Sequence, residues 1–251
     1  MKKLVLTTVC ALSMAGAAFA QGTLVWTSFN ANFIGQTNTS PSALFGGSGT
    51  GGVSGNTLGG GLGANNSTLY YYELLYNTSF NGSQVAVPNA AQLFGGSWLD
   101  VGLTATNGAN PNGRINPANN EVTTAPTPST WNNGTTNNII LVGWSADLGT
   151  SWLSVSNILA AAALGNLNPL IAQVGTSAAY FGESATGYLN PGPTGSPGPT
   201  VFSTSVNANG LPINGSSGNM EMYLIPVPEP TSLALAGLGG LSLLLFRRQR
   251  K

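Results

Sequence analysis

The chemistry open to the middle of this chain is carboxylate chemistry. The 251-residue sequence has no histidine, and its one cysteine, Cys10, lies close to the N-terminus. Histidine-dependent triads, histidine metal sites and thiol catalysis are therefore excluded between residues 21 and 226. Six acids remain in that part of the chain: Glu73, Asp100, Glu121, Asp147, Glu183 and Glu221.

Two carboxylates are enough for glycoside hydrolysis, so a carboxylate-dependent hydrolase stays open as an alternative. Asp100 and Asp147 each follow a tryptophan-containing stretch, which would suit a sugar-cleaving site. The same positions are also explained if Asp100 and Asp147 are simply solvated at the ends of strands and have no catalytic role. No loop with the Asp/Asn spacing of a calcium site is present. We therefore expect no catalytic residue, no metal site and no cofactor.

The five tryptophans allow a second alternative, a secreted carbohydrate-binding module. Aromatic rings stack on sugars, but they also supply much of the buried area of a β-rich core. Trp131 lies in the polar stretch STWNNGTTNN and is the best candidate for an exposed, glycan-stacking ring.

Charge is scarce and unevenly placed. Only 6% of residues are charged, and 42% are apolar, so the chain can bury a sizeable core. Between residues 21 and 226, Arg114 is the single cation against the six acids. One cation cannot neutralise a row of phosphates, so we expect no nucleic-acid partner.

Residues 1–20 have the features of a secretory signal. Two lysines precede an apolar run, and Ala18-Phe19-Ala20 is a small-x-small cleavage site, so the mature chain should begin at Gln21. Signal peptidase and the general secretion machinery are the implied partners. Because Cys10 is removed with the signal, the mature chain can form no disulfide.

The C-terminus has three parts. Pro228 and Pro230 hold Glu229 in an extended segment, because proline disfavours helical geometry in the residue before it. Residues 231–246 are uncharged and, as a helix, would span roughly 24 Å, close to the ~30 Å of a bilayer core. A basic cluster follows: Arg247, Arg248, Arg250 and Lys251. By the positive-inside rule this cluster stays cytoplasmic, which places the body across the inner membrane.

This tail resembles the PEP-CTERM sorting signal of Gram-negative bacteria, with Val227, Pro228, Glu229 and Pro230 as the motif, 231–246 as the membrane helix and the arginine-rich end. The resemblance implies recognition by a membrane-embedded exosortase, a cysteine transpeptidase-like enzyme. It further implies removal of the tail, a transient inner-membrane intermediate, and delivery to the cell surface or extracellular matrix. Such systems accompany exopolysaccharide production and biofilm formation. Glu229 and its prolines would be substrate residues of the exosortase.

The body, residues 21–226, is expected to be mainly β. Strands are predicted near 21–33 and at 68–77, 98–106, 138–145, 199–206 and 220–226, with 68–77 buried on both faces. Val155, Ile158, Leu159 and Ala162 have helical spacing, with Ser154 as the cap and Gly165 as the end. Residues 46–66, 107–137 and 190–199 are predicted loops. This pattern favours an antiparallel β-sandwich with one short helix, flanked by a signal helix and one transmembrane helix.

The sequence thus predicts three segments: a signal peptide (1–20), a secreted β-rich domain (21–226) and a sorting signal (227–251). The leading hypothesis is a non-enzymatic, exported surface or matrix protein associated with exopolysaccharide. The alternatives are the carbohydrate-binding module, the hydrolase, and an uncleaved tail that keeps the protein in the inner membrane.

Overall fold

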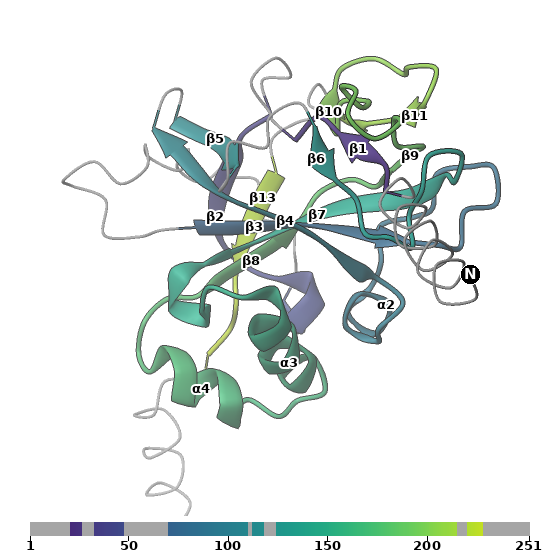
Figure 1. Ribbon diagram of the computed structural model, residues 1–251. Helices are drawn as coiled ribbons and strands as arrows, with labels where there is room; N and C mark the ends of the chain where they lie inside the picture. Colours follow the sequence, from purple (N-terminus) through teal and green to yellow (C-terminus); the bar gives the residue numbers. More distant parts are fainter. Residues whose placement is uncertain are drawn as a thin grey trace, which may run out of the picture.

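The computed structural model describes residues 21–26, 33–47, 70–109, 112–117, 124–214 and 220–227. The chain is mainly β, with a few short helices (Figure 1). The predicted signal helix, the segment 231–246 and the basic cluster lie outside the described residues. Within the described ranges, no helix combines the length and the apolar character needed to cross a bilayer.

A nine-stranded mixed sheet forms the centre of the molecule. Its strands are β2 (Gly35–Pro41), β3 (Tyr70–Asn77), β4 (Leu99–Ala109), β5 (Asn112–Pro117), β7 (Asn137–Ser145), β8 (Tyr180–Glu183), β9 (Gly187–Leu189), β11 (Gly210–Leu211) and β13 (Met220–Leu224). The main path runs β2-β13-β8-β7-β3-β4-β5, and β9 and β11 extend from β7. β13 runs parallel to β2, while the other pairs of this sheet are antiparallel.

The sheet curls until its two end strands meet. Ile34, directly before β2, forms an antiparallel bridge with Arg114 in β5. In β4 a register shift opposite Glu73–Leu75 accompanies Gly102, whose φ of 81° favours glycine. Such bulges bend and twist a strand, which helps the sheet to curl. The inner face encloses an apolar core that includes Tyr72, Leu74, Leu103, Ile115, Leu141 and Met222.

Two small sheets complete the inner core. They pair β1 (Thr23–Leu24) with β6 (Ala125–Pro126) and β10 (Phe202–Ser203) with β12 (Ile213–Asn214). Leu24, Phe202 and Ile213 from these strands are buried with the residues of the large sheet. The predicted loop 190–199 is held against β1, because Thr23 N–H donates to the Gly192 carbonyl at 3.0 Å.

Short helices cover the outer face of the sheet. They are η1 (Ala43–Phe45), α2 (Ala90–Phe94), η2 (Ala146–Leu148), α3 (Trp152–Ala163) and α4 (Asn168–Val174). Figure 1 shows α3 and α4 side by side at one end of the molecule, away from β10 and β11. A second core lies between these helices and the sheet and includes Leu75, Ile140, Trp144, Trp152, Leu159 and Phe181.

The strand and helix predictions are largely confirmed. β3 sends Tyr72 and Leu74 into the inner core and Leu75 into the outer one, as two-sided burial of 68–77 requires. The helix predicted around 155–162 is α3, which begins one turn early, after Ser151. The prediction of a single helix is wrong, because α2 and α4 also form. Asn89 and Gln92 cap the start of α2 reciprocally.

The antiparallel sandwich is not confirmed, because the main sheet is mixed and its ends meet. β2 was missed because its sequence, GQTNTSP, lacks apolar alternation. Residues 107–137 were predicted as a loop but contain β5 and β6. The predicted loop at 46–66 lies mainly outside the described residues.

Candidate functional site

Four acids lie on one face of the main sheet. Of the six acids in the body, Glu121 lies outside the described residues and Asp147 lies in η2. Side chains alternate between faces along a strand, and directly paired residues share a face. By this rule the other four share the outer face with Leu75 and Phe181, since Asp100 pairs with Leu75. They are Glu73, Asp100, Glu183 and Glu221.

Glu73 and Glu183 belong to a single row across the sheet. Glu73 pairs with Val142 on β7, and Val142 pairs with Glu183 on β8. Two strand spacings separate the backbones of the two glutamates, which is about 10 Å. The side chain of Val142 lies between them on the same face.

Glu73 is the most deeply buried of these acids. Its side chain is 2% exposed, and its Oε1 has no hydrogen-bond partner. Burial raises the pKa of Glu73 to about 10, with a further contribution from its hydrogen bond to Asp100 and from the charge of Asp100. Glu73 is therefore protonated at neutral pH and donates to the exposed Asp100 carboxylate, whose Oδ1 also accepts from Gly102 N–H at 2.5 Å.

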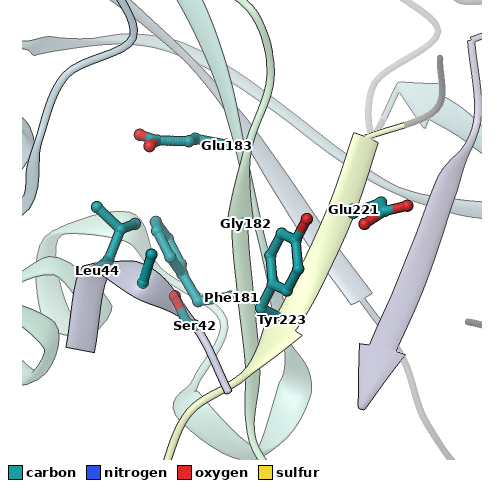
Figure 2. Close-up of a pocket in the computed structure, with 8 residues that line it drawn as sticks. Ser42, Leu44, Phe181, Gly182, Glu183, Glu221 and Tyr223 are labelled. Carbon is teal, nitrogen blue, oxygen red and sulfur yellow. The ribbon is translucent and has the colours of Figure 1, made fainter. Parts of the chain in front are cut away.

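Glu183 lines a small cavity of about 120 Å³ beneath η1 (Figure 2). Burial raises its pKa to about 8, and its Oε2 has no hydrogen-bond partner. The other lining residues are Ser42, Ala43, Leu44, Phe181, Gly182, Glu221 and Tyr223. This cavity is large enough for a few water molecules, and the raised pKa of Glu183 favours its protonated form there.

Glu221 is held by neighbours on its own side of the cavity. It accepts a hydrogen bond from Asn38 Nδ2 at 3.1 Å and is hydrogen-bonded to the Tyr223 side chain. Figure 2 shows the carboxyl groups of Glu183 and Glu221 pointing apart, with Tyr223 between them. They do not form a facing pair around a shared ligand position.

Asp100 also borders an open depression of about 430 Å³. Gln21, Pro126, Thr127 and Pro128 line its other wall. Among the described residues, no group of three or more acids, cysteines or histidines is close enough together to hold a metal ion.

Trp131 is buried, so its prediction as an exposed glycan-stacking residue is wrong. Its ring is 0% exposed and stacks on Tyr76 with centroids 5.3 Å apart. Its Nε1 donates to the Thr135 carbonyl at 2.9 Å. The polar loop folds over the ring, and the Trp131 side chain packs in the inner core. The other tryptophans are buried as well: Trp26, Trp98, Trp144 and Trp152.

The predicted sorting residues begin where the described chain ends. Ile225 is buried, and its N–H donates to the Ala179 carbonyl at 2.9 Å. Val227 packs partly buried against the outer core. Pro228, Glu229, Pro230 and the cluster Arg247, Arg248, Arg250 and Lys251 lie outside the described residues, as do Ala18 and Ala20. Gln21 is exposed, and its carbonyl accepts a hydrogen bond from the Thr194 hydroxyl.

A family model for the PEP-CTERM protein-sorting motif matches residues 226–251. The chain carries a PEP-CTERM sorting motif. The motif is consistent with an exosortase substrate, and it implies export and sorting to the cell surface. The comparisons with curated proteins and with solved structures gave no match.

Sequence reasoning missed the Glu73–Asp100 contact. A glutamate within the apolar stretch YYYELLY was a signal for a buried carboxyl group. Its partner could not be predicted, because the register shift in β4 decides which residue of that strand lies beside Glu73.

Proposed function

We propose that this protein is a non-enzymatic surface or extracellular-matrix protein, processed by an exosortase and associated with exopolysaccharide. The observation that carries the proposal is the PEP-CTERM motif at 226–251, which directly follows the last strand, β13. On this proposal the folded body is delivered to the cell surface, and the tail is the sorting signal that directs it there.

The acidic side chains support a non-enzymatic body. Paired glycosidase carboxyl groups lie about 5–9.5 Å apart, with one of them ionised. Glu73 and Asp100 are instead in direct hydrogen-bond contact. Burial raises the pKa of both Glu73 and Glu183, which disfavours an ionised base in that pair at neutral pH.

Burial of the tryptophans argues against sugar binding by stacked aromatic rings. Association with polysaccharide would instead use the polar, uncharged side chains of the loops, through hydrogen bonds. A pull-down with the producing cell's own polysaccharide tests this part, and absence of binding would remove it.

The decisive experiment is mass spectrometry of the mature C-terminus in surface and membrane fractions. We expect a chain that ends near residues 228–230 outside the inner membrane. Glu229→Ala should leave the chain ending at Lys251 in the membrane fraction, whereas the matched control Asp147→Asn should be processed normally. A wild-type chain that still ends at Lys251 in the membrane would refute the proposal and make the tail a permanent anchor.

A further inference from the structure

The helical end of the molecule is uncharged over a long stretch of sequence. No charged residue occurs between Asp147 and Glu183, a stretch that contains both α3 and α4. Exposed helices of soluble proteins normally place charged residues on their outer side. The outer side of α3 therefore differs from an ordinary water-facing surface.

Two exposed leucines lie on that outer side. Leu153 is 73% exposed and Leu164 is 88% exposed. They are eleven positions apart, which is about three helical turns, so both lie on the same side of the helix and about 16 Å apart. We call this side the outer ridge of α3: Leu153, Asn157, Ala160 and Leu164. It is opposite the buried residues Trp152, Val155, Leu159 and Ala162.

The chain leaves the folded body beside this layer. Ile225 is bonded to Ala179, a few residues after α4, and Val227 packs against the core beneath the helices. In Figure 1 the described chain after β13 ends next to α4. The sorting motif therefore starts at the helical end, far from the loop between β10 and β11.

The link from the body to the apolar segment is very short. Three residues, 228–230, separate Val227 from Thr231, the first residue of the uncharged run 231–246. Even a fully extended chain covers at most about 14 Å from Val227 to Thr231. This reach is close to the diameter of one helix, about 10–12 Å.

We propose that the outer ridge of α3 lies on the lipid surface of the membrane while the tail is still embedded there. This inference rests on the proposed function, because it requires residues 231–246 in the bilayer. With so short a link, the body cannot move away from the membrane, and the helical end is the end that faces it. The link raises the local concentration of lipid at the ridge, so a weak contact is enough.

A bilayer of lipids with no net charge is the partner that suits this surface. Apolar side chains with neutral polar neighbours insert at the headgroup boundary without requiring anionic lipid. The ridge offers no cation for phosphate groups, so the contact should not depend on salt. Removal of the tail would release the ridge, since the contact depends on the link.

Site-specific fluorescence quenching tests the contact in the tail-bearing chain. The protein would be produced without exosortase and placed in nanodiscs of phosphatidylcholine, with or without a nitroxide quencher on the lipids. Because the mature chain has no cysteine, Leu164→Cys gives one labelling site, and Val206→Cys, 67% exposed between β10 and β11, is the matched control. Cys10→Ser in both variants prevents labelling of any uncleaved signal.

We expect the quencher-bearing lipid to remove more than half of the fluorescence of a label at position 164. The fluorescence of a label at position 206 should stay unchanged, and both results should hold at low and at high salt. Equal quenching at both positions, or none at 164, would overturn the proposal. If a second copy of the chain covered the ridge, the lipid quencher would not reach the label at position 164. The absence of quenching would then also overturn the proposal. If cells remove the tail normally but the label at position 164 is not quenched in nanodiscs, the docking is refuted and the processing is not. Quenching at 164 with a tail that cells never remove would refute the processing alone.

Discussion

Replacing Glu73 with glutamine should make the protein more stable at neutral pH. In the folded chain burial raises the pKa of Glu73 to about 10, compared with about 4.5 for an exposed glutamate. Between these values the folded state keeps a proton that the unfolded state has released. The free energy of unfolding therefore falls as pH rises through this window, by up to about 1.4 kcal/mol per pH unit. Glutamine matches the protonated glutamate in shape and can still donate to Asp100.

The measurement is urea unfolding of wild type and Glu73→Gln at several pH values from 5 to 8, followed by the fluorescence of the buried tryptophans. The difference between the two proteins should shift by about 2–3 kcal/mol in favour of the variant from pH 5 to pH 7. Asp147→Asn, an exposed site with the same change in charge, is measured alongside as the control. Parallel curves for wild type and Glu73→Gln across this range would show that Glu73 does not carry a proton in the folded state.

Three further variants test the inner core, the pairing of β8 with β13 and the cavity, and a fourth, Leu164→Ala, is a surface control. Trp131→Ala should cost about 3–5 kcal/mol of stability in denaturant unfolding, because it empties a buried ring site; Leu164→Ala, at an exposed site, should change stability by no more than about 0.5 kcal/mol. An unchanged stability for Trp131→Ala would contradict burial of that ring. Gly182→Ala should lower the melting temperature sharply, because an added Cβ would overlap the backbone carbonyl oxygen of Glu221; a melting temperature equal to wild type would contradict the close pairing of β8 and β13. Glu183→Gln should stabilise the protein more at pH 8 than at pH 5, since burial raises the pKa of Glu183 to about 8; an effect that does not change with pH would show that Glu183 is ionised in the folded chain.

The elements that follow simple periodicity could be predicted from the sequence. β3, β4, β7 and α3 have apolar residues with strand or helix spacing, and all of them form close to the expected positions. The sorting signal in the tail could also be predicted from the sequence, because its parts are contiguous and do not depend on the fold. Its match to the PEP-CTERM motif agrees with that interpretation.

What could not be predicted depends on pairing between distant residues. β2 and β5 contain few apolar residues, and they become strands because β13 and β4 supply partners for their backbones. Trp131 looked exposed because its neighbours are polar, yet its position is decided by Tyr76, more than fifty residues earlier in the chain. The Glu73–Asp100 contact likewise depends on a bulge that leaves no clear pattern in the sequence.

The bridge between Ile34 and Arg114 also bears on how the protein behaves when crowded. A sheet with two free edges offers backbone groups to which other chains can add strands, and such addition leads to fibrils. Here the end strands β2 and β5 meet each other, and so less of either edge is open to a neighbouring molecule. A second molecule would therefore find little free backbone at the junction of β2 and β5 to which it could add a strand.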